Sequence, residues 1–180
     1  MDFLKLAQSR HSIRSFTSEK VSQDNILNLL KAAQSAPSAG NCQPWHFFVV
    51  YDTSVKTSVA DATGKHRAFI ITAPVLIVVC ADISRNEARY GERGKTFYCI
   101  QDTAAAIQNI LLCAKDLGLG TCWCGNFNEN AVSEVLSLPA DRRPVAIIPV
   151  GYPENDLPAT TSRKPLDEIA TFIGANDHLT

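Results

Sequence analysis

The sequence has no long hydrophobic run and no excess of charge of either sign. Its longest apolar stretch, residues 73–81, has the length of a strand, whereas a membrane-spanning helix needs roughly 20 residues. The 17 Lys and Arg balance 18 Asp and Glu for a net charge of −1, so nothing electrostatic favours a nucleic-acid partner. The start, MDFLKLAQSR, lacks a basic residue run followed by an apolar stretch. We therefore expect no secretory signal and no membrane partner.

The usual motifs of nucleotide-binding and hydrolytic enzymes are also missing. Gly118-Leu119-Gly120 comes nearest to GxGxxG, but Trp123 stands where the third glycine belongs, which excludes the dinucleotide fingerprint. Neither a P-loop nor a GxSxG elbow occurs. Zinc needs about four Cys or His ligands at suitable spacing, and the pair Cys122 and Cys124 has no second pair to join it. We expect no metal, and core packing explains the CxC pair as well.

Cysteine, in contrast, is well represented, with six residues at positions 42, 80, 99, 113, 122 and 124. A chain of 180 residues with 46% hydrophobic residues can build its own core as one domain, residues 1–180. We therefore expect reduced thiols and a cytoplasmic location rather than three disulfides. A nucleophile built on Cys42 with His46, or on Cys99, stays open without a supporting signature.

Hydrophobic periodicity predicts helices and strands that alternate only partly. Ser22 opens a helix whose apolar positions follow the i, i+3, i+4, i+7 pattern, and Pro37 ends it. The run 75–80 predicts a buried central strand. Pro149 favours an edge position, or the strand's end, for the strand 145–150. The charged stretch 85–95 predicts a solvated, lid-like loop. Further expected segments are an extended chain at 10–16 and 121–124, a strand at 45–51, and helices at 2–8, 52–62, 96–116 and 129–136.

Three polar segments carry residues that core packing does not explain. The first is Arg10-His11-Ser12-Ile13-Arg14. In an extended chain Arg10, Ser12 and Arg14 point the same way, because side chains alternate. Two guanidinium groups and a hydroxyl on one side would form a cradle for an anion such as phosphate. A solvated basic strand edge is the alternative interpretation.

The other two segments are 36–45 and 118–125. In the first, Asn41 and Gln43 each donate and accept hydrogen bonds, as recognition of a heteroaromatic ring edge requires. A helix-to-strand turn would use the same residues for local backbone bonds. In the second, the glycines would let a flat ligand approach the backbone closely, although a helix C-cap followed by a strand has the same pattern.

Together these segments resemble the nitroreductase family of FMN-dependent oxidoreductases over nearly the whole chain. RHSIRSF is similar to the family's Arg-x-Ser-x-Arg/Lys start. AAQSAPSAGNCQPWHFFVV is similar to its Ala-Pro-Ser-x-x-Asn-x-Gln-Pro-Trp segment. DTAAAIQNILLCAKDLGLGTCWCGNF is similar to its long central helix and the Gly-Leu-Gly-Thr segment that follows. The order and spacing of the three also agree.

The resemblance implies an α+β fold, with a mostly antiparallel central sheet flanked by helices, and a homodimer with FMN in its interface. It also implies roles for cofactor-binding residues. Arg10 and Ser12, with His11 between them, would hold the phosphate and ribityl end, and Arg14 would lie near the pyrimidine edge. Pro37, Ser38 and Asn41 of the partner subunit would line the flavin, with Gln43 close by. The backbone of Cys124 and Gly125 would lie near flavin N5, and Arg163, helped by Lys164, would contact the phosphate.

The reaction that the resemblance implies is a ping-pong hydride transfer. NAD(P)H would reduce FMN and leave, and an electron-poor acceptor such as a nitroaromatic or a quinone would then take its place. Because the cofactor carries the chemistry, no catalytic side chain is expected. A cation such as Arg14 would stabilise negative charge near flavin N1 and O2. The alternatives are a related fold that consumes its flavin or removes halogen from an aromatic, and a flavin-binding dimer without NAD(P)H turnover.

Overall fold

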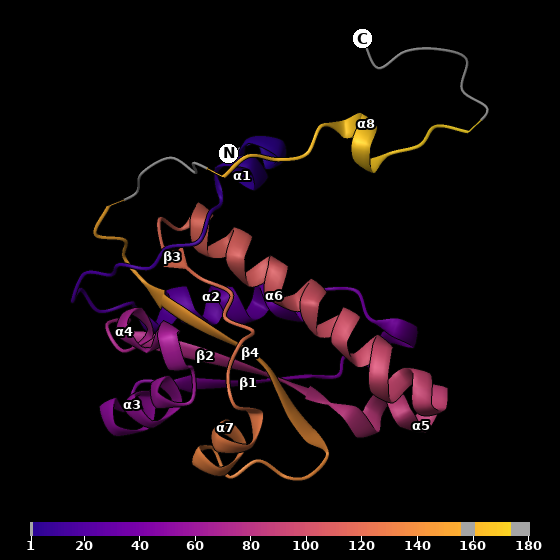
Figure 1. Ribbon diagram of the computed structural model, residues 1–180, viewed down its shortest axis with the longest axis horizontal. Helices are drawn as coiled ribbons and strands as arrows, with labels where there is room; N and C mark the ends of the chain where they lie inside the picture. Colours follow the sequence, from indigo (N-terminus) through magenta and orange to yellow (C-terminus); the bar gives the residue numbers. More distant parts are fainter. Residues whose placement is uncertain (1, 156–160, 174–180) are drawn as a thin grey trace.

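A four-stranded antiparallel sheet lies at the centre of the structure (Figure 1). The computed structural model describes residues 2–155 and 161–173. The sheet has the order β1-β2-β4-β3, and all three ladders are antiparallel. This confirms the expected α+β fold with a mostly antiparallel sheet. The strands are β1 (Trp45–Val50), β2 (Val75–Asp82), β3 (Gly120–Thr121) and β4 (Arg142–Gly151).

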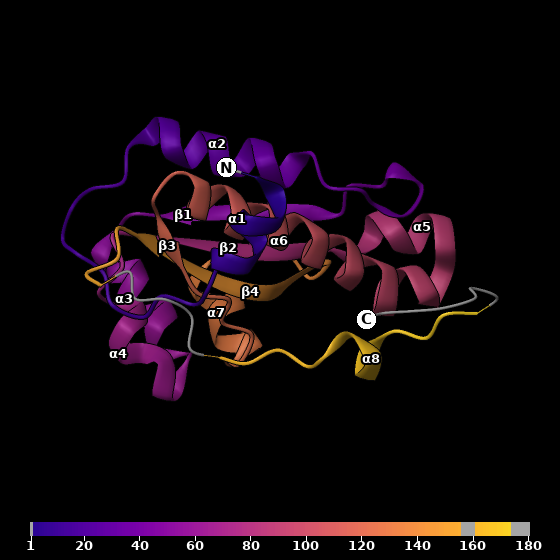
Figure 2. The same cartoon turned by 90° about the horizontal axis from the view of Figure 1, so that it is seen from above.

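Helices cover both faces of the sheet, so the molecule has three layers (Figure 2). One hydrophobic cluster joins α2 and α6 to one face, and a second joins α3, α4 and α7 to the other. The helices are α1 (Phe3–Ser9), α2 (Gln23–Gln34), α3 (Thr53–Asp61), α4 (Arg67–Ile70), α5 (Ile83–Arg93), α6 (Cys99–Asp116), α7 (Glu129–Val135) and α8 (Leu166–Ile169). Short 3₁₀ turns occupy Ala39–Asn41 and Gly64–His66, and a wide turn occupies Gly94–Tyr98.

The two-sided cover explains the continuous apolar run of β2. Ile77 and Val79 join the cluster under α2 and α6, whereas Leu76 and Val78 join the opposite cluster. All eight residues of β2 are buried, because alternate side chains enter different cores. The predicted central strand is therefore confirmed.

Strand β4 lies inside the sheet between β2 and β3, so the predicted edge position is wrong, although Pro149 does lie near the strand's end. Ile147 exchanges both backbone hydrogen bonds with Cys124, on the side away from β2. Pro149, two residues further on, faces that same side. There β3 pairs only with Val150 and Gly151, so the missing N–H of the proline removes no bond to β2.

Two predicted helix ends agree with the structure. The Ser22 side chain caps α2 by accepting from the Asn25 amide at 3.1 Å. Gly118 follows α6 with φ +74°, and the Leu119 amide donates to Ala114 O at 2.8 Å. This left-handed closing turn favours glycine, and it directs the chain from α6 into β3.

The predicted loop 85–95 is helical: α5 runs to Arg93, with a break in the helical backbone at Gly91, and the wide turn then leads into α6. The contacts that hold α5 against the rest of the protein are polar. The Asn86 side chain is fully buried and donates to Asp102 of α6 at 2.8 Å, and Arg85 donates to Asp82 at 3.0 Å. Hydrophobic periodicity does not detect a helix that is fixed by polar contacts.

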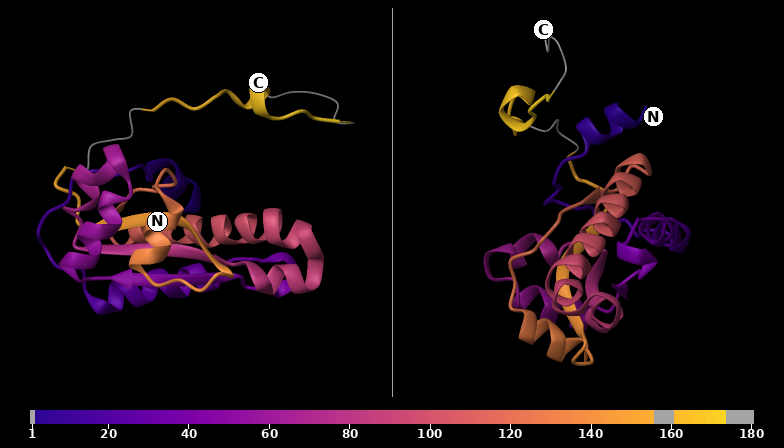
Figure 3. Two further views of the ribbon diagram at one scale, coloured as in Figure 1. Left: turned by 60° about the horizontal axis from the view of Figure 1, so that its bottom comes forward. Right: turned by 90° about the vertical axis from the view of Figure 1, so that its right-hand side faces the viewer.

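The segment 161–173 lies apart from the sheet and its helices (Figure 3), and all its residues are exposed. It contains the one-turn helix α8. Within residues 2–155 and 161–173, we find no helix with the length and apolar character needed to cross a membrane.

Candidate functional site

The segment that carries Arg10, Ser12 and Arg14 runs from the end of α1 along β3. The Ile13 amide donates to Thr121 O at 2.8 Å, and the Ile13 side chain is buried. Gly120 makes this approach possible, because a Cβ there would lie 2.8 Å from Ile13 Cγ2. With Ile13 turned inward, the alternation leaves Ser12 half-buried and Arg14 exposed beside it.

Arg10, Ser12 and Arg14 all act on one group, the thiol of Cys122. After Cys124, they are the groups that lower the pKa of this thiol. The structure thus brings together the three side chains that the alternation placed on one side. Their shared chemistry, two cations and a hydroxyl donor, suits an anion.

The CxC pair lies in the buried cluster under α3, α4 and α7, beside the 10–14 segment. The pKa of Cys122 is lowered by a hydrogen bond from the Cys124 thiol, by Arg14, by Ser12 and by Arg10, against the effect of burial. The pKa of Cys124 is raised by its hydrogen bond to Cys122 and by burial. The sequence interpretation missed Cys122 as a site residue. Its position two residues after Gly120, where the 10–14 segment crosses, was the available signal.

Cys124 and Gly125 differ in what their backbone can offer. The Cys124 amide donates to Ile147 O at 3.0 Å, and its carbonyl accepts from the Ile147 amide at 2.9 Å. Both groups of Cys124 are therefore used within the chain. Gly125 is exposed, so of these two residues it is the one whose backbone can approach a ligand.

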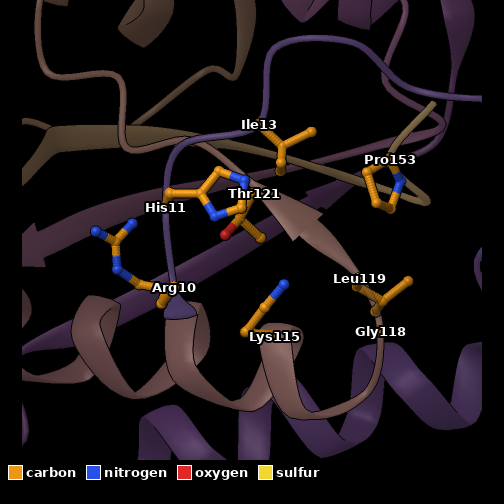
Figure 4. A pocket seen from close by; sticks show the side chains of 8 residues that line it. All are labelled: Arg10, His11, Ile13, Lys115, Gly118, Leu119, Thr121 and Pro153. Atoms are coloured by element: carbon orange, nitrogen blue, oxygen red, sulfur yellow. The ribbon is translucent and has the colours of Figure 1, made fainter. Parts of the chain in front are cut away.

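A small cavity lies behind the same segment, where α6 ends (Figure 4). Arg10, His11 and Lys115 bring basic side chains to its lining, together with Ile13 and Thr121. His11 Nδ1 lies 2.9 Å from Ser9 O. The cavity measures about 20 Å³, which is enough for about one water molecule and too small for a phosphate or a ring.

The loop between α2 and β1 is held in an unusual backbone conformation. Gly40, Asn41 and Gln43 all have positive φ, at 53°, 57° and 50°. Two of these are not glycine, and such strained residues cluster at binding sites. Ser38 Oγ accepts from the Gln43 amide at 2.9 Å, and Gln43 Nε2 donates to Asn41 Oδ1 at 3.2 Å. The predicted residues of this segment are therefore tied to one another.

Asp102, in the first turn of α6, holds this loop in place through a hydrogen bond. Its carboxylate is buried and accepts from the Ala39 amide at 3.0 Å and from Asn86 at 2.8 Å. Arg89 of α5 donates to Gly40 O at 2.6 Å. The sequence interpretation missed Asp102. An acidic residue on the inner face of a long apolar helix was the signal.

An open hollow of about 360 Å³ adjoins the loop, a size within the range of ligand sites. It is lined by Pro37, Ser38, Ala39, Tyr98, Gln101, Asp102 and Ala105. Its floor is α6, where the small side chain of Ala105 leaves room. Pro37 and Ser38, predicted to line a flat ligand, both border this hollow.

The two groups of predicted site residues lie at opposite ends of α6. The loop 37–43 is tied to Asp102 in its first turn, whereas Arg10 shares a cavity with Lys115 in its last. Asp102 and Lys115 are more than three turns apart, roughly 20 Å along the helix axis at 1.5 Å per residue. A single chain therefore presents two separate half-sites.

Arg163 and Lys164 do not join either half-site. Both lie in the exposed segment 161–173. Arg163 Nη1 donates to Thr161 Oγ1 at 3.4 Å, and Lys164 Nζ lies 3.8 Å from Glu168 Oε2. Their predicted contact with a phosphate stays a prediction.

The other chemistry considered from the sequence finds little support. All six cysteines are free thiols. Cys99 donates to Lys95 O at 2.8 Å, and burial raises its pKa, which disfavours a nucleophile. Burial and Arg142 lower the pKa of His46. In the described part of the chain, no group of three His, Cys, Asp or Glu could hold a metal ion.

Comparison with known proteins finds one family profile and several relatives. The Nitroreductase family profile matches residues 7–66 and 55–152. A protein of Archaeoglobus fulgidus, provisionally named NADH dehydrogenase/NAD(P)H nitroreductase, is 36% identical over 157 residues, covering 85% of this chain and 86% of that protein. The FMN reductase (NADPH) of Bacillus subtilis is 29% identical over 160 residues, covering 82% and 64%. The iodotyrosine dehalogenase 1 homolog of Caenorhabditis elegans is 31% identical over 196 residues, covering 93% and 60%.

Solved structures show the same likeness in three dimensions. A nitroreductase family protein from Clostridium novyi NT superposes with a TM-score of 0.78 at 33% identity, covering 86% of this chain and 87% of that one. The layered antiparallel fold, the basic 10–14 segment and the strained 37–43 loop thus occur in a chain whose sequence matches one family from residue 7 to residue 152. The chain belongs to the nitroreductase family.

Proposed function

We propose that two copies of this chain bind FMN between them and use it to pass a hydride from NAD(P)H to an electron-poor acceptor. Membership of the nitroreductase family makes an oxidoreductase the class of enzyme. The observation that carries the proposal is the separation of the two half-sites along α6, roughly 20 Å by helix geometry. Two chains arranged about a twofold axis can place the 37–43 loop of one against the basic segment of the other.

The donor set fits FMN. Arg10 and Ser12 offer charge-assisted and hydroxyl hydrogen bonds that suit a phosphate and a ribityl chain. Gly125 is exposed and can present its backbone to a flat ring. The hollow beside Pro37 and Ser38 has about 360 Å³ of space. Relatives named FMN reductase (NADPH) and NAD(P)H nitroreductase support both the cofactor and the electron donor.

In this proposal the protein positions and stabilises, and the cofactor reacts. When bound, FMN would supply a ring that accepts and releases a hydride at N5. Arg14 would place positive charge beside the pyrimidine edge, where negative charge develops. The strained 37–43 loop of the partner subunit would hold the flavin ring in a fixed position. NAD(P)H and the acceptor would then bind in turn at the exposed face of the ring. Arg163 and Lys164 would add charge at the phosphate after the 161–173 segment docks.

The test is titration of the apoprotein with FMN, followed by flavin fluorescence. Arg10→Ala should weaken FMN binding by about 10- to 100-fold, because a hydrogen bond to a charged group contributes about 1.5–3 kcal/mol. Arg143→Ala is the matched control, since Arg143 pairs with Glu129 at 2.8 Å on another part of the surface. Light scattering should give twice the chain mass of 19.6 kDa. Equal affinities for wild type and Arg10→Ala, or a monomer that binds FMN, would contradict the proposal.

A second candidate is reductive removal of halogen from an aromatic substrate. The 31% identity to the iodotyrosine dehalogenase 1 homolog favours it. Both candidates need the same flavin site and differ in the acceptor. Halide release from a halotyrosine, measured beside nitroaromatic reduction under the same reductant, distinguishes them.

A further inference from the structure

The helix α5 and the wide turn after it carry a cluster of arginine and aromatic side chains. The guanidinium carbon of Arg93 lies 4.8 Å from the ring centre of Phe97 and 5.2 Å from that of Tyr98. Arg93 Nε also donates to the Tyr98 hydroxyl at 3.0 Å. Tyr98 in turn packs edge-to-face against Tyr90, with the ring centres 5.2 Å apart. The aromatic rings therefore hold the Arg93 guanidinium in a fixed place.

This cluster is joined to the strained 37–43 loop. Arg89 Nη1 donates to Gly40 O at 2.6 Å. The Tyr90 hydroxyl lies so close to Gly40 that a Cβ there would overlap it. Tyr98 lines the open hollow of about 360 Å³ beside the loop. Arg93 is thus one hydrogen bond away from a residue of the hollow.

Arg93 keeps its charge and most of its hydrogen-bond donors for a ligand. It is exposed, and within residues 2–155 and 161–173 no carboxylate forms an ion pair with it, whereas Arg67 and Arg85 each have one. Its hydrogen bond in the described part of the chain uses Nε, so the two terminal nitrogens have no partner there. Such a planar pair of donors binds a carboxylate through two parallel hydrogen bonds.

The hollow itself has apolar walls and one buried acid. Pro37, Ala39 and Ala105 border it together with the Tyr98 ring. Asp102 also lines it, but this carboxylate is buried and accepts hydrogen bonds from within the protein. An aromatic molecule can therefore pack against the walls while its charged group meets the arginine.

The position of Arg93 suits an acidic group attached directly to the reacting ring. In the proposed function, on which this inference rests, Pro37 and Ser38 lie against the flavin. Tyr98 borders the same hollow as these two residues, so a ring stacked on the flavin there lies beside Tyr98 and Arg93. In NADPH, by contrast, two riboses and a diphosphate separate the 2′-phosphate from the nicotinamide ring, which carries that phosphate away from this place.

We propose that Arg93 selects electron acceptors that carry a carboxylate on their aromatic ring. The ring of the acceptor packs beside Tyr98 and the apolar walls, and its carboxylate accepts from the two terminal nitrogens of Arg93. Arg93 is then a specificity residue that binds the acceptor and takes no part in the hydride transfer.

The test compares two acceptors of similar shape, the acidic 4-nitrobenzoate and the neutral 4-nitrobenzyl alcohol. FMN-loaded protein is reduced with one equivalent of dithionite without oxygen, and reoxidation by each acceptor is followed at the flavin band. Arg93→Gln should lower the ratio of the two rate constants, acid over alcohol, by about 10- to 100-fold, because charge-assisted hydrogen bonds are lost. Arg93→Lys keeps the cation but not the planar pair of donors, and its ratio should fall between those of wild type and Arg93→Gln.

Arg67→Gln is the matched control and should keep the wild-type ratio. Arg67 is also exposed, pairs with Asp61, and belongs to α4, which lies at the other end of the molecule from α5 (Figure 1). An Arg93→Gln protein that loses rate equally with both acceptors would overturn the proposal, because the role of Arg93 would then be structural. A loss confined to reduction by NADPH, with reduction by NADH unchanged, would assign Arg93 to the nucleotide and overturn it as well.

A binding measurement separates this proposal from the proposed function. Calorimetric titration of the oxidised, FMN-loaded protein with 4-nitrobenzoate involves no electron transfer. Wild type should bind the acid about 10- to 100-fold more tightly than Arg93→Gln does. Equal affinities would overturn the role of Arg93, even where the flavin is reduced and reoxidised as proposed. A flavin that no acceptor reoxidises would contradict the proposed function instead, and the titration would still decide the role of Arg93.

Discussion

Gly120 lets the basic 10–14 segment lie directly against β3. A Cβ at this position would fall 2.8–2.9 Å from three atoms of the Ile13 side chain. Ile13 is buried and its amide is bonded to Thr121, so neither its side chain nor its backbone can move away freely. The placement of Arg10, Ser12 and Arg14 therefore depends on the absence of one methyl group.

Replacing Gly120 by alanine should destabilise the protein by roughly 1–3 kcal/mol, the range for overpacking a filled core. FMN binding should weaken as well, because the 10–14 segment shifts. Gly125→Ala is the control for stability, since the nearest atom to its new Cβ is 3.9 Å away. Urea unfolding of both variants measures the effect. Equal stability of Gly120→Ala and wild type would show that Ile13 does not pack closely against residue 120.

At the level of residues, the sequence supports one half of the candidate site better than the other. Strand alternation alone places Arg10, Ser12 and Arg14 on one side, and in the structure all three act on the thiol of Cys122. Cys122 could not be found in this way. Alternation says which face a residue occupies. The pKa of Cys122 is lowered by Cys124 and also by Arg14, Ser12 and Arg10, which lie more than 100 positions away in the chain.

At the level of elements, α5 and α6 are joined to the 37–43 loop by a buried polar contact. Asp102 accepts from the Ala39 amide and from the Asn86 side chain, whose own Oδ1 is buried without a partner. The carboxylate thus supplies acceptors to the buried Asn86 side chain and to the half-buried Ala39 amide. Because the loop backbone is strained at Asn41 and Gln43, this anchor helps to hold it.

Asp102→Ala should cost roughly 2–4 kcal/mol of unfolding free energy, since each unpaired buried donor costs about 1–3 kcal/mol. It should also increase hydrogen exchange in the loop 37–43. Asp102→Asn is the matched variant: it keeps an acceptor for Ala39, and its amide can donate to a turned Asn86. A smaller loss for Asp102→Asn than for Asp102→Ala is therefore expected. Equal losses would mean that the charge, rather than the hydrogen bonds, stabilises the loop.

The apolar face of α2 could be predicted, whereas the polar inner face of α5 could not. The pattern of Ile26, Leu29 and Ala33 defines α2, and all three are buried. In α5 the buried residue is Asn86, so the charged stretch gave the pattern of a loop. The interior position of β4 was also missed. Pro149 is compatible with it because its backbone faces the side of Cys124 and β3, and the sequence alone does not show how these segments pair.

At the level of the whole molecule, one chain keeps the two groups of predicted site residues apart. The basic segment and the strained loop flank opposite ends of α6, and the fold closes both faces of the sheet with its own helices. The exposed segment 161–173 carries apolar side chains at Leu166, Ile169 and Phe172, each more than 60% exposed. These features suit a functional unit larger than one chain. Arg163 and Lys164 lie in this exposed segment, away from Arg10 and Ser12, so their predicted contact with the phosphate stays a prediction.

The central claim is that this protein takes electrons from NAD(P)H onto bound FMN and delivers them to an acceptor. The most direct measurement is the visible absorption of the FMN-loaded protein without oxygen, before and after addition of NADH or NADPH. We expect the flavin band to bleach with at least one of the two, and to return when a nitroaromatic or a quinone is added. A loaded protein whose flavin band stays unchanged with both nucleotides would contradict the account.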